Sequence, residues 1–275
     1  MNEPGGAHFP ASLLLVGAGR MGGALLRGWL DLGLEARRIH VVEPQPSAQM
    51  RELCTARGVH LGFPAQAPEA LVLAIKPQML AEAAPDLVTF AGEATLVVSI
   101  LAGKRIEDIA ARLPQARAIV RAMPNLPAAI GRGITGAVAN AAVTPAQRRC
   151  AQQLLATVGA VEWLADENLV DAVTAVSGSG PAYVFYLAEC LARAGKAAGL
   201  PDGVAERLAR ATVEGAGALL ASEPETTPAQ LRVNVTSPGG TTAAALELLM
   251  ADNGLSPLLE AAVLAARQRA RDLSG

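Results

Sequence analysis

The chain has 275 residues, of which 51% are hydrophobic and 17% are charged, which is enough apolar material for one large or two ordinary domains. Its formal net charge of −2 and its lack of basic runs argue against nucleic acid or an anionic membrane as a partner. The three widely spaced cysteines fit neither a disulfide framework nor a metal site, so we expect no bound metal and a cytoplasmic location.

The N-terminal stretch MNEPGGAHFPAS lacks the basic and apolar regions of a signal peptide, and we expect it to be a loose leader before the first strand. A long uncharged run at residues 172–188 is interrupted by Ser-Gly-Ser-Gly-Pro, which would break a membrane-spanning helix. We therefore expect no transmembrane segment.

Apolar strands alternate with helical patterns along the first half of the chain. The run at 12–16 leads into a glycine-rich turn, after which apolar residues recur at helical spacing. Helices are expected at 47–58 and from about Lys104, and further strands are expected at 38–43, 70–75, 94–100 and 116–123. This alternation favours an α/β fold with a parallel sheet covered on both faces.

The glycine-rich turn has the pattern G-x-G-x-x-G, directly after a strand and at the opening of a helix. The first glycine makes the tight turn, the second admits a pyrophosphate, and the third packs the helix on the strand. A glycine-rich turn without a ligand is the alternative. We predict a Rossmann-type dinucleotide-binding domain at residues 1–165.

After about Trp163 the pattern becomes almost wholly helical, with turn signals that separate five or six helices. We predict an all-α C-terminal domain at residues 166–275. Its helices are rich in Ala and Gly, which permits close contact between helices. They would either interleave with a second subunit or pack tightly within one chain.

Glu43 ends the second strand, where an acidic side chain would bind the ribose hydroxyls of NAD and repel the extra phosphate of NADP. The nearest arginine that follows it is Arg51, although Gln45 and Ser47 can also bond a phosphate. The choice between NADPH and NADH therefore stays open.

Three more loops follow strands at the edge of the sheet where ligands of open α/β folds bind. These loops carry Lys76-Pro77, the segment 99–103 and the segment 121–125. Because they converge on the place to which the glycine turn points, each becomes a candidate part of one binding site.

Catalytic alternatives can be narrowed by counting. All three histidines precede residue 61, which disfavours histidine-based hydrolysis and metal chemistry. Hydroxyacid dehydrogenases of the 6-phosphogluconate type share this layout but need a catalytic lysine on the interdomain helix. Here Lys196 lies about 18 residues past Gly178, roughly 27 Å along a continuous helix. A protein that senses a dinucleotide without catalysing a reaction is the alternative from a different functional class.

The stretch VNVTSPGGTTAAALELL, residues 233–249, introduces a helix at about Thr241 with two glycines and no charge. A helix start presents unpaired backbone N–H groups and the positive end of a dipole, so it can hold an anion. The same residues also make an ordinary helix cap.

Five segments together resemble the pyrroline-5-carboxylate reductase family, in order and over nearly the whole chain. They are Gly17-Ala18-Gly19-Arg20-Met21-Gly22, Ala74-Ile75-Lys76-Pro77, Arg121–Asn125, Ser177–Phe185 and Ser237–Thr242. Members of this family reduce the cyclic imine 1-pyrroline-5-carboxylate to L-proline with NADPH or NADH. They are homodimers, often assembled further, through the helical domain.

The resemblance implies the roles of the candidate site residues. By this resemblance the cofactor would be lined by Gly17, Gly19, Gly22, Lys76, Pro77, Ala102 and Gly103, with Asn125 near the nicotinamide. The other residues of the same segments, Ala18, Arg20, Met21, Ala74 and Ile75, are candidate cofactor contacts too, as is Glu43 from its place at the strand end. The substrate carboxylate would be held by backbone N–H groups of Gly239, Gly240, Thr241 and Thr242, and the Thr242 hydroxyl would lie beside the ring nitrogen. Ser177, Gly178, Asn234 and Glu167 would complete the substrate site. Leu101 and Leu126 depart from the family, which usually has Ala and Thr there.

Overall fold

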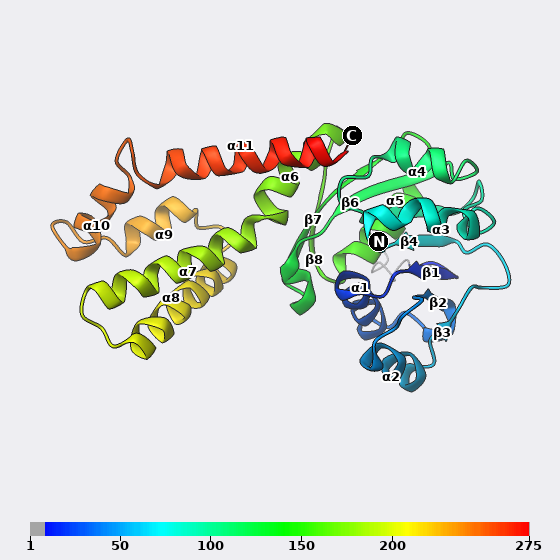
Figure 1. Cartoon of the computed structure of the whole chain (residues 1–275), viewed down its shortest axis with the longest axis horizontal. Coiled ribbons are helices and arrows are strands. Elements are labelled where there is room, and N and C mark those ends of the chain that lie inside the picture. Colours follow the sequence, from blue (N-terminus) through cyan, green and yellow to red (C-terminus); the bar gives the residue numbers. More distant parts are fainter. Residues whose placement is uncertain (1–8, 275) are drawn as a thin grey trace, which may run out of the picture. The chain divides into compact units, whose positions relative to one another are not determined.

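The computed structural model describes residues 9–274 (Figure 1). The chain forms two compact units: residues up to Gly178 together with those from Arg267 onward, and Ser179–Ala266. The domain boundary at 165/166 stays a prediction. Most of the expected N-terminal leader, and His8 with it, lies outside the described residues.

The first unit is built on an eight-stranded sheet with the order β3-β2-β1-β4-β5-β6-β7-β8. The first six strands are parallel, β7 is antiparallel to β6, and β8 is parallel to β7. This is the strand order of dinucleotide-binding folds, extended by two strands. The strands are β1 (Leu13–Val16), β2 (Ile39–Val42), β3 (His60–Leu61), β4 (Ala70–Leu73), β5 (Leu96–Ser99), β6 (Ala118–Met123), β7 (Gly133–Ala139) and β8 (Gly159–Trp163).

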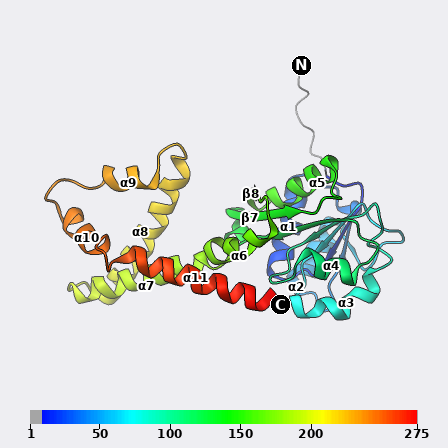
Figure 2. The same ribbon diagram turned by 90° about the horizontal axis from the view of Figure 1, so that it is seen from above.

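Apolar side chains project from both faces of the central strands, as expected for a parallel sheet that is covered on both faces. In β1, Leu13 and Leu15 join one buried cluster, whereas Leu14 and Val16 join the other. Figure 2 shows helices α1 and α5 on one side of the sheet and α3 and α4 on the other. The helices of this unit are α1 (Arg20–Asp31), α2 (Ala48–Arg57), α3 (Leu80–Leu87), α4 (Ile106–Arg112), α5 (Pro145–Ala156) and α6 (Val170–Val173).

The elements β7, α5 and β8 were not foreseen individually from the sequence. Both strands begin with a glycine, and β7 has a second one at Gly136, so these strands resemble turns in a hydrophobicity pattern. The glycines are required by close packing, because a Cβ on Gly136 would lie 2.8 Å from Val173, and one on Gly159 would lie 1.9 Å from the carbonyl oxygen of Gly133. Helix α5 is joined to α1 by a hydrogen bond from Trp29 Nε1 to the carbonyl of Leu154 (2.8 Å).

The second unit is helical, as predicted. Its elements are α7 (Gly180–Ala197), α8 (Asp202–Ser222), α9 (Pro228–Asn234), α10 (Thr241–Leu249) and the first part of α11 (Leu255–Ser274). Helices α7 and α8 pack closely near their connection, where a Cβ on Gly195 would lie 3.3 Å from the Cβ of Ala205. Between residues 9 and 274 no helix combines the length and the apolar character needed to cross a bilayer.

Candidate active site

The turn between β1 and α1 has the geometry of a pyrophosphate-binding loop. Gly17 has a φ of +93°, and a Cβ there would lie 2.7 Å from the backbone of Ala74. A Cβ on Gly22 would lie 2.1 Å from the carbonyl oxygen of Gly17. A Cβ on Gly19, in contrast, would meet no described atom within 4 Å. Gly17 therefore makes the turn, Gly22 permits the helix to pack closely, and Gly19 leaves an open approach for a ligand.

The start of α1 is suited to an anion. Its N-cap residue is Gly19, which provides no side-chain cap, and its first turn contains no acidic residue. The N–H groups of that turn and the positive end of the helix dipole therefore face the loop. Arg20 stands at the first helical position, and Met21 packs against the buried cluster beneath the helix. These residues fit the pyrophosphate of a dinucleotide.

Glu43 is held against the glycine turn. Its Oε2 accepts a hydrogen bond from the N–H of Ala18 (2.9 Å), and its Oε1 accepts one from the N–H of Gln45 (3.2 Å). The carboxylate lines a pocket of about 420 Å³ between β2, α1 and the start of α2. The side chains that sequence reasoning placed here, Arg20, Gln45 and Ser47, all line this pocket.

Arg27 lines the same pocket and was missed from the sequence. It lies seven residues after Arg20 on α1, which is two helical turns and places both on one helix face. That spacing was the signal that could have identified it. Arg51, the nearest arginine after Glu43 in the sequence, is not among the lining residues.

A second pocket, of about 250 Å³, is formed by the carboxyl ends of β1, β2 and β4 together with α3. Its walls are mostly apolar and include Val42, Pro44, Phe63, Ile75 and Met79. Such walls suit a flat aromatic base. The predicted contact residue Ile75 therefore lies in a pocket at the ligand edge of the sheet.

The loops after β4 and β5 form a third pocket, of about 410 Å³. Pro77, Ala102 and Gly103 line it, as the sequence-based site requires, together with Asp171 and Thr174. Lys76 directly precedes the 3₁₀ turn Pro77–Met79 at the rim of this region. Ala74 directly follows β4 and lies beside the glycine turn, so the residues 74–77 all lie at the ligand edge.

The region at the end of β6 contains further predicted site residues. Asn125 is buried, and its Oδ1 accepts a hydrogen bond from the N–H of Ile134 (3.0 Å), which fixes the orientation of the amide. A Cβ on Gly178 would lie 3.0 Å from Cε of Met123. Ser177 belongs to a π-helical turn, Thr174–Gly178, and within the described residues its buried hydroxyl has no hydrogen-bond partner. Single π-turns and unsatisfied buried hydroxyls are typical of ligand sites.

Glu167 lies close to this region, but its carboxylate has protein partners. Its Oε1 lies 3.0 Å from Nη1 of Arg121 and accepts a hydrogen bond from the N–H of Ile106 (2.8 Å). Its Oε2 lies 3.9 Å from Nη2 of Arg105. The predicted contact of Glu167 with the substrate stays a prediction.

The remaining predicted residues form a separate group in the second unit. Helix α10 begins at Thr241, as predicted, and its N-cap residue Gly240 provides no side-chain cap. Gly239 has a φ of +67°, which favours glycine. Asn234 ends α9, where its Oδ1 accepts a hydrogen bond from Nε2 of Gln230 (2.8 Å). The N–H of Gly240 donates to the carbonyl of Ser237 (3.0 Å), so it is not free for the anion contact predicted from the sequence. The start of α10 therefore offers the N–H groups of its first turn, which begins at Thr241, and the hydroxyls of Thr241 and Thr242.

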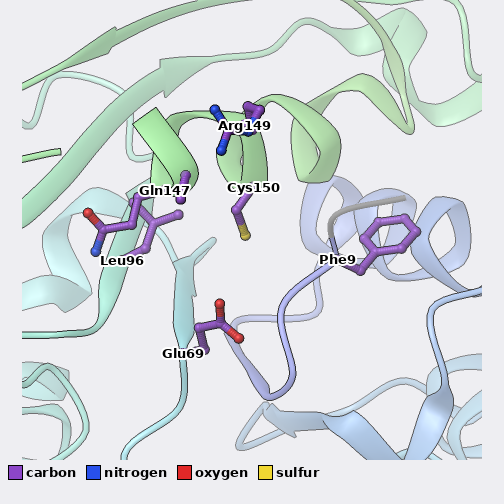
Figure 3. Close-up of a pocket in the computed structure, with 7 residues that line it drawn as sticks. Phe9, Glu69, Leu96, Gln147, Arg149 and Cys150 are labelled. Carbon is purple, nitrogen blue, oxygen red and sulfur yellow. The ribbon is translucent and has the colours of Figure 1, made fainter. Parts of the chain in front are cut away.

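Another pocket lies at the opposite ends of the strands, away from the ligand edge (Figure 3). It has about 150 Å³ and is formed by residues that include Glu69, Leu96 and Cys150. Burial, and after it the Glu69 carboxylate, raises the pKa of the Cys150 thiol to about 12, which makes this thiol a poor nucleophile. Among residues 9–274 no cluster of three or more His, Cys, Asp or Glu side chains could hold a metal.

The fold and the glycine loop define an NAD(P)H-dependent oxidoreductase with a Rossmann-type domain and a helical domain. Residues 167–273 match the family model described as pyrroline-5-carboxylate reductase dimerisation, and residues 12–103 match the model of coenzyme F420-dependent NADP oxidoreductases. The chain belongs to the pyrroline-5-carboxylate reductase family. It is 40% identical to the pyrroline-5-carboxylate reductase of Pseudomonas aeruginosa over 265 residues, which is 95% of this chain and 96% of the relative.

Solved structures agree with this assignment. A pyrroline-5-carboxylate reductase from Coxiella burnetii superposes with a TM-score of 0.89 at 35% identity, covering 97% of this chain and 99% of the other. The Plasmodium falciparum pyrroline carboxylate reductase, whose structure contains NADP, superposes with a TM-score of 0.76 at 25% identity. It covers 96% of this chain and 98% of its own.

Proposed function

We propose that this protein reduces 1-pyrroline-5-carboxylate to L-proline with NAD(P)H, the last step of proline biosynthesis. The observation that carries the proposal is the start of α10, where two glycines and Thr241–Thr242 open a helix without a side-chain cap. A small carboxylate is an anion of the kind that such a helix start binds. No basic side chain is needed at this turn, because the backbone N–H groups and the positive end of the helix dipole stabilise the negative charge of the carboxylate.

The residues divide the chemistry between them. Bound NAD(P)H supplies the hydride that is added to the imine carbon. The ring nitrogen then becomes an amine and needs a proton, which the Thr242 hydroxyl is placed to donate in our proposal. Asn125, fixed by Ile134, would orient the nicotinamide, and the unsatisfied Ser177 hydroxyl would face the substrate.

The hydroxyacid dehydrogenase alternative lacks its catalytic lysine. Lys196 lies near the C-terminal end of α7, where its Nζ pairs with Glu206 (2.9 Å) and Asp202 (3.7 Å). The neighbouring carboxylates raise the pKa of Lys196 and keep it protonated. A lysine held in this way is unsuited to act as a base.

Residues 167–273, which include the whole helical second unit, match a dimerisation domain, so the protein forms a homo-oligomer. Our finer proposal is a homodimer formed through residues 166–275. All three cysteines are free, which supports the proposal of a reducing, cytoplasmic location.

The decisive experiment measures oxidation of NADPH and of NADH with 1-pyrroline-5-carboxylate, and reduction of NADP⁺ and NAD⁺ with L-proline at high pH. We expect activity in both directions with at least one cofactor. A purified, folded protein that is inactive in both directions with both cofactors would refute the proposal.

Cofactor preference is tested separately at Glu43. Replacing Glu43 by Ser removes a negative charge from the pocket that Arg20 and Arg27 line, so kcat/KM with NADPH should rise relative to NADH. A change of about ten-fold in the ratio is expected, corresponding to roughly 1.4 kcal/mol. An unchanged ratio would show that the Glu43 carboxylate does not meet the ribose.

A further inference from the structure

Arg121 is a buried arginine at the ligand edge of the sheet. It lies in β6 two residues before the strand ends, and it is only 3% exposed. Its Nη1 lies 3.0 Å from Oε1 of Glu167, and its Nη2 lies 3.8 Å from Oδ1 of Asp171. Asp171 is also buried, at 6% exposure. Buried ion pairs contribute little net stability because both partners lose their hydration, so this arrangement needs another explanation.

The carboxylate of Glu167 connects Arg121 to a second segment. It accepts the hydrogen bond from the N–H of Ile106, the first residue of α4. Arg105, directly before α4, also donates from Nη2 to Oδ1 of Asn168 (3.2 Å). The start of α4 is therefore bound to the segment that begins at Glu167 by two side chains.

The guanidinium of Arg121 is thus linked, through Glu167 and Asp171, to two other segments that carry site residues, and it lies itself on a third. The strand end β6 leads into Met123 and Asn125. The loop before Ile106 contains Ala102 and Gly103, and the segment after Glu167 leads through α6 to the π-turn with Ser177. Asp171 itself lines the pocket that Ala102 and Gly103 form. Arg121 is absent from the lining residues of that pocket, so it acts on the site through its partners.

We infer that Arg121 is a positioning residue for the reaction. Through Glu167 and Asp171 it holds the loop at 101–106 and the π-turn at 174–178 in fixed relation to the end of β6. The inference rests on the proposed function, because the three segments matter together only if cofactor and substrate meet there. It also gives Glu167 a role that involves no contact with the substrate.

The test replaces Arg121 by Met and compares it with Arg117→Met. Arg117 precedes the other end of the same strand and forms an exposed pair with Glu93 (2.6 Å), so it is a matched control. Well below the melting temperature, Arg121→Met should raise the dissociation constant for NAD(P)H and lower kcat, each by about ten-fold or more, because small misplacements of reacting groups are costly. Hydrogen exchange of the Ile106 amide should accelerate. Arg117→Met should change none of these three quantities.

Arg121→Met removes the cation beside the buried Asp171 carboxylate and the partly buried Glu167 carboxylate, and it can fail to fold for that reason alone. The triple variant Arg121→Met, Glu167→Gln, Asp171→Asn removes these charges together. We expect it to fold and to show the same weakened cofactor binding and lowered kcat. Wild-type values in the folded triple variant would overturn the inference, since the network would then only stabilise the fold. Cofactor titration and exchange do not require turnover, so they remain informative if the proposed reaction itself is refuted.

Discussion

At the scale of single residues, substitutions of Thr242 can distinguish binding of the substrate carboxylate from proton transfer to the ring nitrogen. The carboxylate contacts proposed at α10 depend on backbone N–H groups, which a change of side chain leaves in place. Thr242→Ala should therefore lower kcat by about ten-fold or more, toward the roughly 10² to 10⁴ that a positioned acid contributes. Affinity for NAD(P)H should be nearly unchanged, and Thr242→Ser should keep much of the activity. Normal turnover by the alanine variant would mean that the proton comes from solvent.

His40 makes stability depend on pH. Its ring stacks on that of His60 in the neighbouring strand, with the ring centroids 4.9 Å apart. Burial, and then the charge of His60, lowers the pKa of His40, while a backbone hydrogen bond with Gly62 partly opposes this effect. The folded state thus favours the neutral imidazole. The stability that this preference contributes is fully present above the pKa of about 6.5 that His40 has in the unfolded chain. It is lost as the pH falls through the lower pKa of His40 in the folded state.

Melting temperatures measured between pH 5 and pH 8 check this expectation. The wild-type protein should lose stability on the acid side of this range. His40→Leu should show a shallower decline, because a leucine takes up no proton. Equal slopes for the two proteins would assign the decline to other groups.

At the scale of elements, the glycine turn allows two substitutions with opposite results. A methyl group on Gly22 has no room beside the carbonyl of Gly17, whereas one on Gly19 enters open space. Gly22→Ala should therefore destabilise the fold, by about 1–3 kcal/mol as for other overpacked sites. Gly19→Ala should leave the melting temperature nearly unchanged and weaken NAD(P)H binding. Thermal unfolding and cofactor titration of both variants distinguish these outcomes; unaltered binding in Gly19→Ala would contradict the assigned role.

Local patterns account for the elements that could be predicted. The buried strands, the glycine turn and the start of α10 each depend on residues close together in the sequence, and all three were located from it. The strands β7 and β8 were missed because packing against Val173 and Gly133 demands glycine, which weakens the hydrophobic pattern. The link between Arg121 and Glu167 joins residues 46 positions apart. Only the order of strands brings them together, so no local pattern could indicate it.

At the scale of the whole molecule, the second unit lacks a core of its own. Among its described residues, the buried apolar side chains are only Ala192, Ala205 and Ala209. Large apolar side chains such as Phe185, at 57% exposure, and Leu248, at 78%, lie open. Such surface is normally covered by a partner.

We therefore expect sedimentation at micromolar concentration to give a mass of at least twice the 28.1 kDa of the chain. Phe185→Glu should shift the protein toward monomer and reduce its stability, whereas a charge introduced on an exposed face of α2, such as Gln49→Glu, should not. A wild-type protein that sediments only as a monomer would contradict the dimerisation model.

The course of α11 has a consequence for how this chain can be divided. The helix begins in the second unit, and its last residues, from Arg267 onward, belong to the first, where Ala270 and Leu273 line the pocket beside Gly103. The first unit is therefore encoded by two separated stretches of the gene. A single recombination crossover cannot transfer it intact, so a functional chimera with a relative must exchange residues 1–178 and 267–275 together.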